Sequence, residues 1–191
     1  LVCAAAALTM GEALGWEFHG MCDALASFRG IQRRLELVGT AEGVAVLDDY
    51  AHNPAKIRAA WAAVAETAPR ILAVWRPHGF GPLAAMLPEL RAAFRTVCRP
   101  QDTLYILPVF YAGGTASQTV SSTLLVRQLS ADGVSTVDGD GYPSLLDRLT
   151  RDARAGDVVL FMGARDPDLP VMARQLLERL AQRRDTHHAR G

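Results

Sequence analysis

The fold depends on residues 44–54, Val44-Ala-Val-Leu-Asp-Asp-Tyr-Ala-His-Asn-Pro54, which join an apolar run to the start of a helix. Val44 to Leu47 is β-branched and apolar and predicts a buried strand. Asn53 and Pro54 are typical of a helix cap and a first helical position, and a helix is expected from about residue 53 to 67. The polar residues between them lie where a strand of an open α/β sheet ends, which is where such sheets bind ligands. A structural cap by Asp48 or Asp49 is the alternative interpretation.

Two helical patterns precede this stretch. Residues 1–14 are rich in alanine and end at Gly15, and residues 18–27 carry apolar side chains at helical spacing. Together they predict a helical hairpin over residues 1–30. Residues 33–40 then alternate, and Ala41-Glu-Gly43 predicts a tight turn into the strand at Val44, so these two strands should pair in antiparallel fashion.

Strands and helices alternate after residue 54. Strands are expected at 71–75, 104–110, 134–137 and 158–162, and helices at 82–97, 120–130, 143–153 and 168–183. The pattern predicts an α/β, Rossmann-like, three-layer domain over residues 31–183, with about six strands, mostly parallel and one antiparallel. Residues 184–191 are polar and are expected to form a disordered tail.

Composition excludes several classes of function. The chain has 191 residues, half of them hydrophobic, and a formal net charge of zero, so a basic surface for nucleic acid is not expected. No apolar run is long enough to span a bilayer, and membrane binding is not expected. Cys3, Cys22 and Cys98 are scattered, which favours buried thiols in a reducing cytosol over a redox role.

The usual phosphate-binding and nucleophile motifs are missing. The sequence has no Gly-x-x-x-x-Gly-Lys-Ser/Thr and no Gly-x-Ser-x-Gly, and Lys56 is its only lysine. His52 and His78 lie on different loops without a third ligand, so no metal site is predicted. The residues alone therefore indicate a binding domain with a polar rim and an incomplete catalytic set.

Five ordered segments carry a resemblance to a known family. They are Ser27-Phe-Arg-Gly-Ile-Gln-Arg-Arg-Leu-Glu36, Val46-Leu-Asp-Asp-Tyr-Ala-His-Asn-Pro54, Val74-Trp-Arg-Pro-His78, Val109-Phe-Tyr-Ala-Gly113 and Leu160-Phe-Met-Gly-Ala164. They resemble the C-terminal domain of Mur ligases, the ATP-dependent amide-forming ligases of peptidoglycan synthesis. Within the family the pattern is most similar to the enzymes that add L-alanine to UDP-N-acetylmuramate, and next to the peptide ligases of murein recycling.

The resemblance implies that the chain is a piece of a longer enzyme. Residues 1–30 would be the end of the central ATPase domain, and residues 31–183 the C-terminal domain. The implied partners are ATP with Mg²⁺, whose ligands would lie mainly outside this chain, UDP-N-acetylmuramate, and an amino acid or peptide. An apolar face left uncovered on the hairpin would favour self-association. A non-catalytic domain that binds a nucleotide or a partner protein is the alternative of another class.

Site residues follow from the same resemblance. It implies that Arg34 contacts the nucleotide phosphates and acts in catalysis, that Asp49 lies near the ribose, and that Tyr50 and His52 flank the adenine. A surface pair of Arg34 with Glu36 is the alternative. The acceptor amine would be surrounded by His78, Tyr111, Thr115, Ser117, Arg165 and Asp166. The loop after His78 lacks the arginines that clamp the amino acid in relatives, and Arg76 and Arg165 are the possible replacements.

Overall fold

The structure, a computed structural model, describes residues 2–113 and 120–188, with side chains as far as residue 183. The chain divides into two compact units, residues 1–31 and residues 32–191. Each unit is described separately below.

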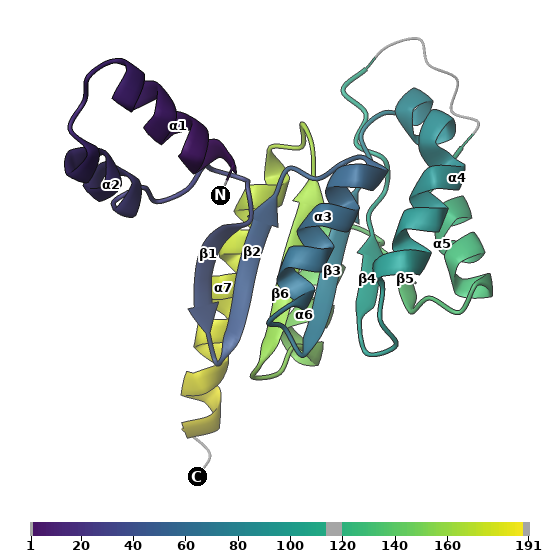
Figure 1. The fold of residues 1–191 in the computed structure, drawn as a ribbon. Coiled ribbons are helices and arrows are strands. Elements are labelled where there is room, and N and C mark those ends of the chain that lie inside the picture. Colours follow the sequence, from purple (N-terminus) through teal and green to yellow (C-terminus); the bar gives the residue numbers. More distant parts are fainter. Residues whose placement is uncertain (1, 114–119, 189–191) are drawn as a thin grey trace. The chain divides into compact units, whose positions relative to one another are not determined.

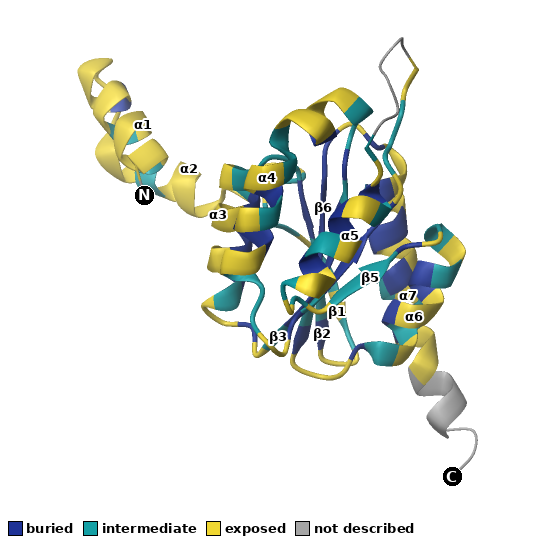
Figure 2. Ribbon diagram, turned by 90° about the vertical axis from the view of Figure 1, so that its right-hand side faces the viewer, coloured by how far each residue is buried: buried dark blue, intermediate teal, exposed yellow. Residues whose placement is uncertain are grey.

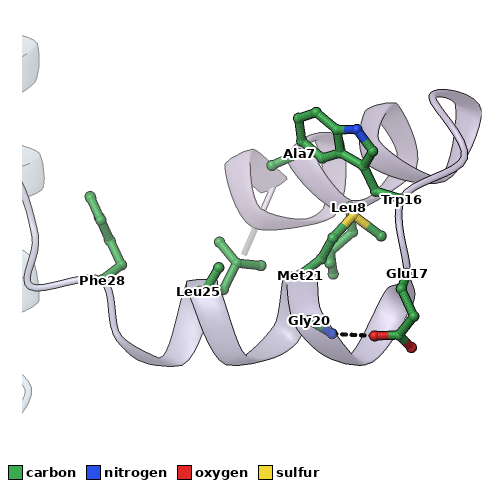
Figure 3. A pocket seen from close by; sticks show the side chains of 9 residues that line it. Ala7, Leu8, Trp16, Glu17, Gly20, Met21, Leu25 and Phe28 are labelled. Atoms are coloured by element: carbon green, nitrogen blue, oxygen red, sulfur yellow. Dashed lines mark hydrogen bonds between the residues drawn. The ribbon is translucent and has the colours of Figure 1, made fainter.

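The first unit is a pair of helices, α1 (Val2–Ala13) and α2 (Phe18–Ala26). Gly15, with a φ of +76°, turns the chain between them, and the Glu17 side chain caps α2 by accepting hydrogen bonds from the backbone N–H groups of His19 and Gly20. The helices approach closely at Gly11, where an added Cβ would lie 2.0 Å from the sulfur of Met21. Trp16, Met21 and Leu25 line an apolar groove of about 480 Å³ beside this contact (Figure 3).

The second unit alternates strands and helices after an initial hairpin. Its elements are β1 (Glu36–Ala41), β2 (Val44–Asp49), α3 (Pro54–Ala65), β3 (Arg70–Arg76), α4 (Phe80–Val97), β4 (Thr103–Ile106), α5 (Ser122–Ala131), β5 (Thr136–Asp138), α6 (Tyr142–Asp152), β6 (Asp157–Gly163) and α7 (Asp168–His188). Asn53 caps α3, since its side chain accepts a hydrogen bond from the Lys56 backbone N–H at 3.0 Å. Helix α4 continues through Pro88.

The six strands form one mixed sheet in the order β1-β2-β6-β3-β4-β5. Strand β1 is antiparallel to β2, and the remaining neighbours are parallel. Glu42 and Gly43, with φ values of +50° and +73°, form the two-residue turn of the β1–β2 hairpin. These findings confirm the predicted α/β class and the single antiparallel strand.

Helices cover both faces of this sheet (Figure 1). One core lies between the sheet and α3, α4 and α5 and contains Trp61, Trp75 and Phe94; the other lies between the sheet and α6 and α7 and contains Phe161. The central strands are buried, while the outer sides of the helices are exposed (Figure 2). Strands buried on both faces explain the continuous apolar runs in the sequence.

Three predicted strands, β1, β4 and β5, are shorter than expected. Strand β5 begins at Thr136 rather than at residue 134. Strand β1 begins at Glu36 rather than at residue 33, because Arg33 and Leu35 have φ values of +57° and +47° and belong to a turn. Strand β4 ends at Ile106 rather than at residue 110, because Pro108 has no backbone N–H to continue a ladder; only an isolated bridge from Phe110 to His78 follows.

The last helix is longer than expected. Helix α7 ends at His188, whereas the sequence pattern predicts a helix that ends at residue 183. Among the described residues, no helix is both long and apolar enough to cross a membrane.

Candidate functional site

The carboxyl ends of the parallel strands meet at one edge of the sheet. Asp49 and Trp75 both pair with Met162 of the central strand β6, and Trp75 also pairs with Ile106 of β4. The loops that follow β2, β3, β4 and β6 therefore begin at the same level. This edge is the place predicted for the site.

The turn before β1 is fastened to this edge by Arg33. Its guanidinium donates to Asp48 Oδ2 at 3.1 Å and to the Gly163 carbonyl at 2.7 Å, and it lies 5.0 Å from the centre of the Tyr50 ring. Its backbone N–H donates to Glu36 Oε2 at 2.8 Å. Arg33 thus connects the turn, β2 and β6. The residue that the family resemblance singles out is its neighbour, Arg34.

Asp48 is the buried partner in this arrangement. Its side chain is 2% exposed, and burial raises the pKa of its carboxyl above the ordinary value although Arg33 acts in the opposite direction. Oδ1 has no hydrogen-bond partner among the described residues. The contact of Asp48 in this structure is therefore a largely buried ion pair with Arg33.

The Asp49 side chain points to the face of the sheet opposite Asp48, and it accepts hydrogen bonds from backbone N–H groups. Oδ2 accepts a hydrogen bond from the Leu35 N–H at 2.8 Å, and Oδ1 accepts one from the Ala51 N–H at 2.7 Å. These bonds hold the turn before β1 and the loop after β2 against each other. Each carboxylate oxygen has a further lone pair that can accept another hydrogen bond.

Three aromatic rings follow Asp49 along the edge. The rings of Tyr50 and His52 lie 5.6 Å apart and those of His52 and His78 5.1 Å apart, in both cases edge to face. His52 Nδ1 lies 2.9 Å from the Tyr50 carbonyl and donates a hydrogen bond to it, because a carbonyl oxygen can only accept. Burial lowers the pKa of His78, and the nearby His52 and Arg165 lower it further.

Arg76 is engaged by structural partners. It donates to Asp166 Oδ2 at 2.7 Å, and its guanidinium lies 5.3 Å from the Phe110 ring centre and 4.9 Å from the Tyr142 ring centre. The Tyr142 hydroxyl also donates to Asp166, which has no exposed surface. Asp166, expected near the acceptor amine, therefore positions Arg76.

The other residues that were expected to surround the acceptor amine lie in different surroundings. Tyr111 is half-buried, with its ring 5.3 Å from that of Phe80, and Arg165 is exposed with a φ of +63°. Thr115 and Ser117 lie outside the described residues. No group of three or more metal-ligating side chains is found in the part of the chain that the structure describes.

Comparison with known protein families shows which family contains the residues of this edge. A family model described as "Mur ligase, glutamate ligase domain" matches residues 33–165, which include the whole edge from Arg33 to Arg165. The chain belongs to the Mur ligase family.

Mur ligases with curated names match most of the chain. A UDP-N-acetylmuramate–L-alanine ligase of Chelativorans sp. (strain BNC1) is 35% identical over 163 residues, covering 84% of this chain and 34% of that protein. The ligase of the same name from Nostoc punctiforme is 31% identical over 164 residues, covering 84% and 33%. The chain spans about a third of the length of these relatives.

Solved Mur ligase structures share the fold. The UDP-N-acetylmuramate–alanine ligase of Thermotoga maritima matches with a TM-score of 0.73 and 21% identity over 94% of this chain and 37% of that one. A MurF ligase from the same organism, in complex with ADP, matches with a TM-score of 0.62 and 18% identity over 94% and 38%.

Some residues of this Mur ligase site could not be found from the sequence. Arg33 and Arg34 are adjacent, and only the turn shows that Arg33 takes the buried carboxylate. Tyr142 lies far along the chain from Arg76 and Asp166, and no motif marks it. The predicted antiparallel hairpin was the available indication that residues before β1 would lie near the end of β2, and the observed register pairs Glu36 with Asp48.

Proposed function

We propose that this chain is the C-terminal part of an ATP-dependent ligase that joins L-alanine to UDP-N-acetylmuramate. The observation that carries the proposal is the 35% identity over 84% of the chain to a ligase of that name. Residues 1–31 would then be the end of the central domain of the same enzyme. Cys3 is exposed and Cys22 and Cys98 are half-buried, so the expectation of buried thiols was wrong. All three are free, which supports a reducing compartment such as the cytoplasm.

The reaction would proceed through an acyl phosphate. ATP transfers its γ-phosphoryl group to the sugar's carboxylate and ADP leaves; the amine then attacks the acyl carbon, losing a proton, and phosphate leaves. Arg34, exposed at the edge, would stabilise charge on the transferring group. Asp49 would accept hydrogen bonds from the ribose, and Tyr50 and His52 would flank the adenine. The Mg²⁺ ligands would come mainly from the rest of the enzyme.

The acceptor would bind around His78. Because burial and its neighbours lower its pKa, the neutral imidazole is favoured, which can accept a proton from an ammonium group. Tyr111 and the exposed Arg165 lie on the loops of the same edge and would complete this subsite. Arg165 is the better placed of the two possible arginines to bind the acceptor's carboxylate, since Arg76 is engaged by Asp166.

A chimera tests the proposal. Residues 1–191 replace the matching third of the Chelativorans ligase, and phosphate release is measured with ATP, UDP-N-acetylmuramate and L-alanine. We expect release that depends on all three substrates. The control chimera carries the matching third of the Nostoc punctiforme ligase. A folded chimera that binds UDP-N-acetylmuramate and stays inactive while the control is active would favour the non-catalytic alternative.

The second candidate function is peptide ligation in murein recycling. It is favoured by one observation, the loop His78-Gly-Phe-Gly-Pro-Leu83, which contains no arginine to clamp a small amino acid. The same chimera distinguishes the two functions. Phosphate release that depends on L-alanyl-γ-D-glutamyl-diaminopimelate and not on L-alanine would support the peptide ligase and contradict the L-alanine proposal.

A further inference from the structure

A small cavity lies between the turn before β1 and the first turns of α3. It has a volume of about 260 Å³ and is lined by Arg34, Leu35, Asp49, Lys56, Ala59 and Ala60. Lys56, Ala59 and Ala60 follow one another at helical spacing, so they share one face of α3. The two alanines have no long side chain to fill the space beside the lysine.

The charges around this cavity are unbalanced. Asp49 is 8% exposed, and both of its oxygens already accept backbone hydrogen bonds. Arg34 is exposed and Lys56 half-buried, and within the described ranges neither side chain makes a hydrogen bond or ion pair. Two cations thus face one carboxylate that is already engaged. The first turn of a helix adds further positive potential, so the cavity favours an anion.

Lys56 is also unusual in the composition of the chain. It is the only lysine, while nineteen of the twenty basic residues are arginine. An ammonium group is a compact point charge with rotatable donors, whereas a guanidinium is a planar fork. Side by side, the two can bind different oxygens of a polyphosphate.

We propose that Lys56 binds a phosphate group of the nucleotide together with Arg34. The inference rests on the proposed function, because it assigns the ligand as ATP. It adds a residue that the motif comparison did not single out. Lys56 lies beside Asp49, the proposed ribose ligand, so one cavity wall would hold both the sugar and the phosphates. Lys56 and Arg34 both bind the phosphates in the ground state, and Arg34 in addition stabilises the charge that grows during transfer.

The single lysine makes a direct test possible on the chain itself. Reductive methylation with ¹³C-formaldehyde gives one dimethyl-lysine signal besides the N-terminal amine and keeps the positive charge. Inorganic tripolyphosphate, ATP and adenosine are then titrated while the signal is followed by NMR. We expect tripolyphosphate and ATP to shift the Lys56 signal saturably, and adenosine to leave it in place.

Two variants show whether the NMR shift reports a specific phosphate site or a general attraction of anions to positive charge. Arg34→Gln should weaken the tripolyphosphate shift about tenfold in apparent affinity, because one charged hydrogen-bonding partner is lost. Arg58→Gln is the matched control, since Arg58 is exposed on the same helix but does not line the cavity, and it should leave the affinity unchanged. No saturable shift, an equal shift with adenosine, or an equal effect of both variants would overturn the proposal.

The chimera provides a second readout. Lys56→Gln should raise the KM for ATP about tenfold and leave kcat within about twofold, as expected for a contact present in ground state and transition state alike. An unchanged KM would contradict the assignment. If the chimera is inactive while the isolated chain binds tripolyphosphate through Lys56, the function fails and the anion site stands. If the chimera is active and the NMR signal of Lys56 does not move, the proposed function stands and the proposed anion site is wrong.

Discussion

Two adjacent arginines have different surroundings in this domain. Arg33 donates to the buried Asp48 and to the Gly163 carbonyl, while Arg34 is exposed and lines the cavity at α3. The positive φ values of Arg33 and Leu35 create the turn that separates the two side chains. A structural arginine and the arginine that we propose to bind the ligand therefore occupy neighbouring positions.

Substitution of each arginine should separate these roles. Arg33→Ala should lower the free energy of unfolding by about 3 kcal/mol, because it leaves Asp48 buried without its cation. Arg34→Ala should leave stability unchanged and lower kcat of the chimera on the order of 10²-fold. Urea unfolding and steady-state kinetics measure both. Equal losses of stability would show that Arg34 is structural as well.

Asp49 should behave differently from Arg34. Asp49→Ala should raise the KM for ATP in the chimera, because ribose contacts are present before and during phosphoryl transfer. It should also lower the free energy of unfolding by about 1–3 kcal/mol, since the Leu35 and Ala51 N–H groups lose their acceptor. A normal KM in the fraction of protein that remains folded would restrict Asp49 to its structural role.

His78 should make stability depend on pH. Its pKa in the folded chain lies below the ordinary value of 6.5, so the unfolded chain binds the proton more readily. The free energy of unfolding should therefore fall as the pH drops through 6.5 toward the lower folded pKa. Unfolding at pH 7.5 and 5.5 measures this loss, which should be smaller in His78→Gln. An identical pH dependence in both proteins would contradict the prediction.

At the scale of elements, Asp102 joins three segments of one core. Its carboxylate accepts from the Ile71 N–H at 2.8 Å, from Arg99 Nε at 2.9 Å and from Trp61 Nε1 at 3.3 Å. Burial alone would raise the pKa of Asp102, but hydrogen bonds from Arg99 and from two backbone N–H groups hold it below the ordinary value. The start of β3 is thereby tied to α3 and to the loop before β4.

Asp102→Asn should lower the free energy of unfolding by about 2–3 kcal/mol at neutral pH, because the amide cannot accept all of these bonds and Arg99 loses its counter-charge. The pKa of Asp102 is lowered on folding, so its contribution should disappear as the pH falls below 3.8. Urea unfolding at pH 7 and at pH 3 measures both effects. Asp140→Asn, at an exposed position, is the control; an equal effect there would refute the assignment.

The helices and strands were largely predictable, because the sheet is covered by helices on both faces and its central strands are therefore largely apolar. Buried strands such as β3 and β6 are continuous apolar runs, and the Asn53–Pro54 cap was visible in the sequence. The errors lie where local geometry overrides pattern. The alternation at residues 33–35 indicated a strand, but positive φ values place these residues in a turn.

The site was less predictable than the fold. Its position at the carboxyl edge follows from the parallel sheet, and the contact between His52 and His78 follows from that position. The partners of Arg33 and Arg76 do not. Arg33 bonds to the Asp48 side chain of β2 and to a backbone carbonyl of β6. Arg76 contacts Tyr142 of α6 and Asp166 of the loop after β6. The cavity beside Lys56 requires the turn before β1, which the sequence pattern did not predict.

At the scale of the whole molecule, the two units differ in how much apolar surface they bury. The 32–191 unit has two hydrophobic cores. In the hairpin, among described residues, only Gly11 is buried, while Val2, Met10 and Trp16 are 83%, 68% and 63% exposed. Trp16, Met21 and Leu25 border the groove shown in Figure 3. Exposed apolar patches beyond a few hundred Å² commonly mark contact surfaces.

We therefore expect the isolated chain to self-associate through the hairpin. The mass measured by analytical ultracentrifugation should rise with protein concentration. The double substitution Met10→Glu/Trp16→Glu should reduce this rise, because burying either carboxylate in an apolar contact is unfavourable.

Val171→Glu is the matched control, since Val171 is 41% exposed on α7 in the other unit, and this variant should associate like the parent chain. Circular dichroism shows whether the double variant keeps its helices. A parent chain that stays monomeric at high concentration, or equal association of all three proteins, would show that the apolar hairpin surface does not drive assembly. Because the groove is lined by Trp16, Met21 and Phe28, concentration-dependent quenching of tryptophan fluorescence should accompany association only if contact occurs there.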